Sequence, residues 1–259
     1  TMARAAEITA EAHRAAMEVA RPGMTEYQVQ AVVEGVFRER GSARNGYDSI
    51  VASGPNACVL HYVENSRTLR RGDLLLLDAG AEVDLYTADI TRTWPIGGGF
   101  DDAQRAIYAI VLKAQKAAIR AAVPGKPWNR IHDVALREIT RGLRDLGLLK
   151  GDLRKLVDRG ACRKWFMHGT SHWLGMDVHD VGPYEDAAGK PIELRAGMAL
   201  TVEPGLYFDA RDKSVPKEFR GIGVRIEDDV VLTRGGNRVL TDGVPKEIAE
   251  IEALCAPVA

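Results

Sequence analysis

The stretch Gly72-Asp73-Leu74-Leu75-Leu76-Leu77-Asp78-Ala79-Gly80 decides the fold, because in it an apolar run ends at a carboxylate. An uninterrupted run of leucines bounded by glycines predicts a strand that is buried on both faces. A second stretch, 125 residues later, has a similar order of residue types: Gly197-Met198-Ala199-Leu200-Thr201-Val202-Glu203-Pro204-Gly205. It places a carboxylate, Glu203, where the first copy has Asp78. The two stretches together indicate a strand unit that the chain uses twice.

A second repeat precedes each of these strands. The stretch 22–29 (PGMTEYQV) resembles 124–131 (PGKPWNRI) at an offset of 102 residues. Either alignment alone is weak, but both occur in the same order along the chain. We therefore expect an α+β fold of two pseudo-symmetric halves, each with two helices and a sheet, and about 23 extra residues in the second half. Matching ligands on the two sides of a pseudo-twofold axis would form a central site.

Helical and strand patterns fit this arrangement. Thr25 and Gln28 form a capping-box pattern before apolar residues at helical spacing. Helices are expected over 3–19, between Thr25 and Gly41, and over 101–122, 131–146 and 246–254. Strands are expected over 47–52, 59–63, 73–83, 86–94, 165–168, 198–208 and 223–232, with a tight turn near Asp84.

Composition excludes several classes of protein. The chain has 259 residues, with 35 Lys and Arg against 36 Asp and Glu, and a net charge of −1. A nucleic-acid-binding protein usually has a basic excess, so no nucleic-acid partner is expected. No apolar run approaches the roughly 18 residues of a membrane span, and the charged N-terminus is unlike a signal peptide. Three scattered cysteines argue against a disulfide framework, which favours a cytoplasmic protein without a membrane partner.

Two carboxylates on the expected hairpin need an explanation. Asp78 ends a buried run, and a buried carboxylate is costly unless it is paired or bound to a metal. For Asp78 alone, turn capping beside Gly80 would be sufficient. For Asp89, the simple alternative is a salt bridge to Arg92. Residues an odd number apart on a strand face opposite sides, however, so Asp89 and Arg92 should point apart.

Two more carboxylates lie on expected interior strands. Glu203 has valine and leucine neighbours, and Glu227 lies in the stretch Gly223-Val224-Arg225-Ile226-Glu227. A salt bridge from Arg225, on the same face of that strand, would account for Glu227. It would leave Asp78, Asp89 and Glu203 unexplained.

The histidines are concentrated in the sequence. His61 lies in the first half, and the run from His168 to Asp180 contains His168, His172 and His179. A single histidine in such a place is more often a hydrogen-bonded core residue than a ligand, but three within 12 residues are not a random scatter. His13 and His132 are expected to be ordinary helix or surface residues without a role.

Interior carboxylates in this number would carry too much negative charge without cations. Two divalent metal ions about 3.5–4 Å apart would neutralise them. Oxygen ligands with one imidazole suit Mn²⁺ best, with Zn²⁺ or Co²⁺ as alternatives. Such a pair lowers the pKa of a bridging water and supplies a hydroxide near neutral pH. The cysteines Cys58, Cys162 and Cys255 have no metal-ligand spacing and are expected to be small buried residues.

These motifs resemble those of the pita-bread metallopeptidases, in the branch of Xaa-Pro aminopeptidases and prolidases. The carriers are Leu77–Gly80, Ala88–Thr93, His168–Asp180, Val202–Gly205 and Arg225–Asp228, and the histidine segment matches the proline-peptidase signature at each defined position. Methionine aminopeptidases share that fold but differ around the ligand histidine. The resemblance covers nearly the whole chain and implies the pita-bread fold.

The resemblance also implies roles for individual residues. The metal ligands would be Asp78, Asp89, His172, Glu203 and Glu227. Of these, Asp89 and Glu227 would bridge both ions, and Glu203 would also transfer a proton from the attacking hydroxide. The outer histidines His61, His168 and His179 would contact substrate and stabilise the tetrahedral intermediate. Tyr207 would lie near the substrate, and Arg225 would support the metal ligands from behind.

The implied reaction is hydrolysis of the Xaa-Pro bond, which releases the N-terminal residue of a proline-containing peptide. The resemblance implies one catalytic domain over residues 1–259, without the N-terminal domain usual in this branch, although the chain starts at Thr1-Met2. The resemblance is also compatible with a homodimer. The alternatives are a methionine aminopeptidase-type enzyme and a non-catalytic peptide-binding relative. A creatinase-like amidohydrolase needs no such metal set and is disfavoured.

Overall fold

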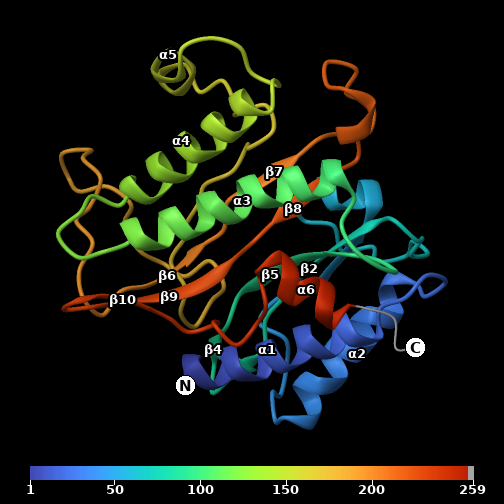
Figure 1. The fold of residues 1–259 in the computed structure, drawn as a ribbon. Coiled ribbons are helices and arrows are strands. Elements are labelled where there is room, and N and C mark those ends of the chain that lie inside the picture. Colours follow the sequence, from blue (N-terminus) through green and yellow to red (C-terminus); the bar gives the residue numbers. More distant parts are fainter. Residues whose placement is uncertain (256–259) are drawn as a thin grey trace.

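The structure is a computed structural model that describes residues 1–255 (Figure 1). Its α-helices are α1 (Met2–Val19), α2 (Glu26–Glu39), α3 (Asp102–Ala121), α4 (Arg130–Asp145), α5 (Leu153–Asp158) and α6 (Ile248–Leu254). Its strands are β1 (Ile50–Ser53), β2 (Leu74–Ala79), β3 (Glu82–Val83), β4 (Tyr86–Thr87), β5 (Ile90–Pro95), β6 (Ala199–Val202), β7 (Gly205–Tyr207), β8 (Gly223–Arg225), β9 (Asp228–Thr233) and β10 (Gly236–Val239). Two short 3₁₀ helices are η1 (Gly54–Cys58) and η2 (Lys217–Phe219). Within residues 1–255, no helix has both the length and the apolar character that a membrane crossing requires.

The expected α+β arrangement of two halves is confirmed. The helix pair α1–α2 packs together in the first half, and α3–α4 packs together in the second. In Figure 1 the first pair (blue) lies below the strands and the second pair (green) lies above them. The two three-stranded antiparallel sheets have the orders β1-β2-β5 and β10-β9-β6. The repeated stretches form β2 and β6, so they occupy matching places.

The strand beside the repeated strand differs between the halves. In the first sheet, β1 runs along β2, with Ile50 opposite Asp78. In the second, the segment 170–174 takes that place beside β6 through a bridge between Trp173 and Leu200. The His172 carbonyl accepts a hydrogen bond from the Thr201 N–H at 3.1 Å. These contacts with β6 therefore hold His172 beside the end of that strand.

The strands expected to be continuous are interrupted close to the carboxylates. The structure breaks 73–83 after Ala79, 86–94 at Ala88-Asp89, 198–208 at Glu203-Pro204 and 223–232 at Ile226-Glu227. Proline has no N–H for a ladder, which explains the break at Pro204. At Gly80, a Cβ atom would lie 1.9 Å from the Ala88 carbonyl oxygen, so only glycine allows the two segments to cross there. Asp89, Glu203 and Glu227 therefore lie at the breaks, whereas Asp78 lies within β2, opposite Ile50.

Two expected strands are wrong. Residues 59–63 form turns, because Val59 and Val63 are about half exposed and the neighbouring segment bends into η1. Residues 165–168 form no strand either: Trp165 ends a turn, in which the Trp165 and Phe166 N–H groups bond to the Cys162 carbonyl. β-Branched and aromatic residues favoured a strand there, but neither segment finds a partner strand. The helix α5 and the strand β10 were not expected.

The interpretation of two minor histidines and the cysteines needs correction. His13 is fully buried on α1, where its ring nitrogens lie 3.0 Å from the carbonyls of Thr9 and Ile90. His132 is half-buried and bonds the Thr170 hydroxyl at 2.9 Å, so neither is a surface residue. Among the cysteines, Cys162 is buried, while Cys58 and Cys255 are only partly covered.

Candidate metal centre

A cavity of about 280 Å³ receives residues from both halves of the fold. The residues that line it are Leu60, His61, Asp78, Asp89, His168, Gly169, Ser171, His172, His179, Glu203, Arg225 and Glu227. All five expected metal ligands and three of the expected substrate histidines are among them. Tyr207 is not; it lies behind His168 and is only 2% exposed.

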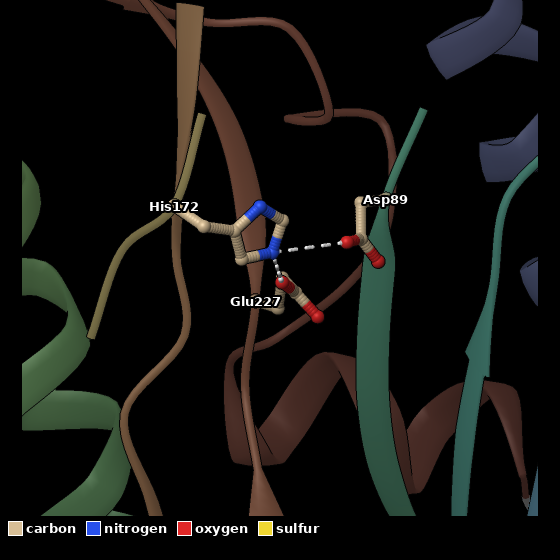
Figure 2. Close-up of side chains that lie close together, drawn as sticks. All are labelled: Asp89, His172 and Glu227. Carbon is tan, nitrogen blue, oxygen red and sulfur yellow. Dashed lines mark ion pairs between the residues drawn. The ribbon is translucent and has the colours of Figure 1, made fainter. Parts of the chain in front are cut away.

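His172 is held so that one ring nitrogen faces the carboxylates. Its Nδ1 lies 2.8 Å from the Trp173 carbonyl oxygen, which accepts a hydrogen bond only if Nδ1 carries the proton. The other nitrogen, Nε2, lies 3.4 Å from Asp89, 3.5 Å from Glu203 and 3.9 Å from Glu227. In Figure 2 the His172 ring reaches across from one side of the site toward Asp89 and Glu227. This orientation leaves Nε2 as the atom that can bind a cation.

Asp78 is fixed by two partners on opposite sides. Its Oδ1 accepts a hydrogen bond from the Tyr47 hydroxyl at 2.6 Å, and its Oδ2 lies 2.6 Å from Arg225 Nη2. The same Tyr47 hydroxyl lies 2.5 Å from Asp89 Oδ1. One hydroxyl proton cannot serve both carboxylates at once. Tyr47 therefore brings Asp78 and Asp89 together without balancing their charge.

Arg225 connects the metal-ligand set to the histidine wall. Its Nε donates to the Thr91 hydroxyl at 3.0 Å, and that hydroxyl donates to Glu227 Oε2 at 2.6 Å. Its Nη1 donates to the Tyr207 hydroxyl at 3.1 Å, which lies 2.8 Å from His168 Nε2. The expected alternative, a direct salt bridge between Arg225 and Glu227, is wrong. Arg225 pairs with Asp78 and reaches Glu227 only through Thr91.

The expected separation of Asp89 and Arg92 is confirmed. Arg92 is fully buried and pairs with Asp228 at 2.7 Å, on the side of the sheet away from the cavity. It also donates to the Glu227 carbonyl at 2.6 Å. Arg92 thereby holds the backbone of Glu227 in place, while its charge is paired with Asp228 and not with the carboxylates that line the cavity.

Burial and the charges of neighbouring carboxylates raise the pKa of three carboxyl groups in the cavity. Burial, and then the charges of Asp89 and Glu203, raise the pKa of Glu227 well above its ordinary value. Burial and the Asp78 charge raise the pKa of Asp89. Burial also raises the pKa of Glu203 to about 7, although His172 and Arg225 oppose this. Each shift says that the ionised form lacks sufficient positive charge nearby.

The pKa of His172 is also raised, which for an imidazole favours the charged form. Burial alone would lower its pKa, but the hydrogen bond to Asp89 and the charges of Asp89 and Glu203 raise the pKa to about 9. Three residues, Asp89, His172 and Glu227, each offer a ligand atom, and these atoms lie within 4.8 Å of one another. A bound divalent cation would favour ionised carboxylates and a neutral imidazole. The donor set therefore fits a hard or borderline metal ion.

The outer histidines form the wall opposite the carboxylates. His179 packs edge-on against His172, with ring centres 4.5 Å apart, and the His61 ring lies 6.4 Å from His179. Burial and the neighbouring Arg225 lower the pKa of His168 to about 3. His168 is therefore neutral near pH 7, and its ring is held by the Gly169 carbonyl oxygen, 2.6 Å from Nδ1, and the Tyr207 hydroxyl, 2.8 Å from Nε2.

Comparison with known proteins identifies the family of this chain. Residues 1–234 match the family model of metallopeptidase family M24. The chain belongs to metallopeptidase family M24. Similar proteins are the Xaa-Pro aminopeptidases of Haemophilus influenzae (49% identical over 98% of this chain) and Escherichia coli (50% over 97%). Among solved structures, Pseudomonas aeruginosa aminopeptidase PepP has a TM-score of 0.97 and 53% identity over 98% of this chain.

The M24 relatives establish the fold and also show a difference in length. The expected pita-bread fold is confirmed by the likeness to PepP and to proline aminopeptidase P II of Yersinia pestis, with a TM-score of 0.95. The chain spans 58% and 56% of the two curated relatives and 57% of PepP.

Two contacts of this M24 site are not evident from sequence reasoning. Tyr47 reaches Asp78 because β1 pairs with β2, and the register of that pairing is not written in the sequence. Thr91 could have been identified, since it lies two residues from Asp89 and shares its side of the strand. The rule that separates Asp89 from Arg92 therefore also places Thr91 toward the cavity.

Proposed function

We propose that the chain hydrolyses the Xaa-Pro bond at the N-terminus of peptides, with two divalent metal ions bound in the described cavity. The observation that carries the proposal is His172 Nε2, which lies within 3.9 Å of the buried carboxylates of Asp89 and Glu227 and the partly buried Glu203, in a cavity that further histidines line. The curated relatives named Xaa-Pro aminopeptidase, about half identical to this chain, support the substrate class.

Asp78, Asp89, His172, Glu203 and Glu227 would hold the ions, and Mn²⁺ suits this oxygen-rich set best. When bound, the ions lower the pKa of water and supply hydroxide near neutral pH. The family resemblance makes Asp89 and Glu227 the candidates to bridge both ions, and each offers a ligand atom within 4.8 Å of one from His172. Arg225 would orient Asp78 through its 2.6 Å contact.

Glu203 would hold and transfer the proton during hydrolysis. Its carboxylate lies 3.5 Å from His172 and 3.7 Å from His168, between the ligand set and the histidine wall. A general base works best when its pKa is near the operating pH. Burial raises the pKa of Glu203 to about 7 without metal, and a bound cation would favour the ionised form that accepts a proton.

The histidine wall would bind the peptide. His61 and His179 border the cavity on one side, and His168, backed by Tyr207 and Arg225, borders it on the other. Neutral imidazoles can accept from a peptide N–H or donate to its carbonyl without adding charge. The proline ring and the next peptide group would lie against this wall, with the free amine toward the carboxylates.

The test compares three peptides with the metal-free chain and with the Mn²⁺-loaded chain. We expect Mn²⁺-dependent release of the first residue from an Xaa-Pro dipeptide, an Xaa-Pro-Xaa tripeptide, or both, and little release from Met-Ala-Ser. The ratio of the two Xaa-Pro rates separates dipeptidase from aminopeptidase preference. Faster cleavage of Met-Ala-Ser would replace this proposal by a methionine aminopeptidase. Peptide binding without cleavage would indicate a non-catalytic relative.

Compartment and assembly remain predictions. No disulfide joins the three cysteines, all of which lie in the described part of the chain, and this is compatible with the cytoplasm. A homodimer is tested by sedimentation, in which a single monomeric species would exclude it.

A further inference from the structure

Glu26, on the first turn of α2, is a buried carboxylate far from the metal ligands in sequence. It is fully buried, and among residues 1–255 no ion pair involves it. The nearest guanidinium in its network, that of Arg67, donates instead to Asp73 and to the Ser53 hydroxyl. A buried charge of this kind is costly unless hydrogen bonds replace the lost water. The buried carboxylate of Glu26 therefore needs a structural explanation.

The hydrogen bonds to Glu26 all come from one segment. Its Oε1 accepts from the Ser53 N–H and hydroxyl, both at 2.7 Å, and from Asn56 Nδ2 at 3.1 Å. Its Oε2 accepts from the Tyr62 hydroxyl and from the Arg67 N–H, both at 2.8 Å. A carboxylate has about four lone-pair sites, so its accepting capacity is used in full.

These donors lie on both sides of His61 in the sequence. Ser53 and Asn56 precede the histidine, and Tyr62 and Arg67 follow it. Beyond η1 the segment 59–67 contains no helix or strand, and its outward residues Val59 and Val63 are about half exposed. Neither backbone ladder nor apolar burial of those side chains fixes the position of His61. The anchors nearest to His61 are its two neighbours: Leu60 packs against an apolar cluster, and Tyr62, 8% exposed and part of that cluster, also donates to Glu26.

We propose that Glu26 is a positioning residue for His61, through the segment 53–67 that it ties to α2. The inference rests on the proposed function, because His61 matters for turnover only as part of the peptide-binding wall. Glu26 touches neither the cavity nor a candidate metal ligand. Its effect on catalysis must therefore pass through the segment and disappear when His61 is absent.

The test is a double-mutant cycle with Glu26→Gln and His61→Ala. The glutamine keeps the shape but turns an NH₂ group toward donors of the segment, so at least one hydrogen bond is lost. A misplacement of about 1 Å can cost about 100-fold in rate, so we expect kcat/KM on an Xaa-Pro-Xaa tripeptide to fall about 10- to 100-fold. In the His61→Ala background the same change should alter kcat/KM by less than about twofold.

Two further variants keep the result interpretable. Tyr62→Phe removes the 2.8 Å hydrogen bond to Glu26 next to His61, together with the longer 3.4 Å bond from the Ser66 N–H, and should reproduce part of the loss even if Glu26→Gln folds poorly. Glu39→Gln, an exposed glutamate on the same helix, is the matched control and should leave kcat/KM unchanged. Equal losses from Glu26→Gln with and without His61 would overturn the proposal.

Hydrogen exchange separates this inference from the proposed function. In Glu26→Gln, amides of 54–66 should exchange faster than in the wild type, while those of β2 should not change. This readout needs no substrate, so it decides the role of Glu26 even if the chain proves inactive on Xaa-Pro peptides. Unchanged exchange in 54–66 would overturn the inference and leave the proposed function untouched.

Discussion

Replacing Thr91 with valine removes one hydroxyl from the site and keeps the shape of the side chain. That hydroxyl donates to Glu227 Oε2 at 2.6 Å and accepts from Arg225 Nε at 3.0 Å. Both partners are charged and buried, and Thr91 itself is fully buried. The substitution therefore leaves Glu227 free to turn and Arg225 with an unsatisfied donor, with no water able to replace either contact easily.

The expected magnitude follows from these two contacts. A hydrogen bond to a charged group contributes about 1.5–3 kcal/mol. Loss of a group that orients a metal ligand typically weakens metal binding about 10- to 100-fold, or about 1.4–2.7 kcal/mol. The two ranges overlap. We expect Thr91→Val to weaken Mn²⁺ binding by that factor, and to reduce turnover at limiting Mn²⁺ more than at saturating Mn²⁺.

Calorimetric titration of the metal-free protein with Mn²⁺ measures this effect directly. Thr140→Val is the matched control, because Thr140 is equally buried but its hydroxyl bonds the Leu136 carbonyl within α4. The control should lose stability and keep its metal affinity. If Thr91→Val binds Mn²⁺ within about twofold of the wild type, the hydroxyl does not orient Glu227, and the reasoning fails.

Three other changes should have distinct outcomes. Asp89→Asn, which removes a candidate bridging charge, should lower kcat by more than the roughly 100-fold expected for an orienting residue, and near-normal steady-state rates at saturating Mn²⁺ would contradict this. Dialysis against a chelator should abolish Xaa-Pro hydrolysis and added Mn²⁺ should restore it, whereas persistent activity with no metal by elemental analysis would speak against a metalloenzyme. Burial lowers the pKa of His13 to about 4 from its ordinary 6.5, so the unfolded chain binds the proton more readily and stability should fall by about 3 kcal/mol as pH drops through that window. Urea unfolding near pH 7 and near pH 4 measures this change. The free energy of unfolding should depend less on pH in His13→Asn than in the wild type, and an equal pH dependence in both proteins would refute the assignment to His13.

The candidate carboxylate ligands could be predicted because each lies among apolar residues, where a charged group is unfavourable. Asp78 and Glu203 end apolar strands, and a carboxylate there has few acceptable partners. The repeat then placed the two in matching positions, as β2 and β6 show. Such arguments need only residue type and spacing along the chain. They singled out the four carboxylates, whereas the choice of His172 among the histidines came from the family resemblance.

The partners of these ligands depended on information that the sequence does not contain. A salt bridge from Arg225 was the simple alternative for Glu227, on the basis of a continuous strand, but the strand is interrupted at Ile226-Glu227. Arg225 then pairs with Asp78, from the other half of the fold. Tyr47 likewise required the register between β1 and β2. Contacts between the halves are tertiary facts, and periodicity cannot supply them.

His13 shows an error of a different kind. It shares a face of α1 with Thr9, Ala16 and Met17, all buried, so helical spacing alone would have placed it in the core. Its polar character favoured the surface instead. Hydrogen bonding to the carbonyls of Thr9 and Ile90 is what makes the buried position acceptable.

The central claim is that this cavity holds the metal ions that make the chain an Xaa-Pro peptidase. The most direct measurement is the rate of Xaa-Pro-Xaa hydrolysis as a function of Mn²⁺ bound per chain, by stepwise loading of the metal-free protein. Our account predicts no hydrolysis without metal and a rate that reaches its maximum when two ions are bound. Full activity in the metal-free protein, or saturation with less than one ion per chain, would contradict it.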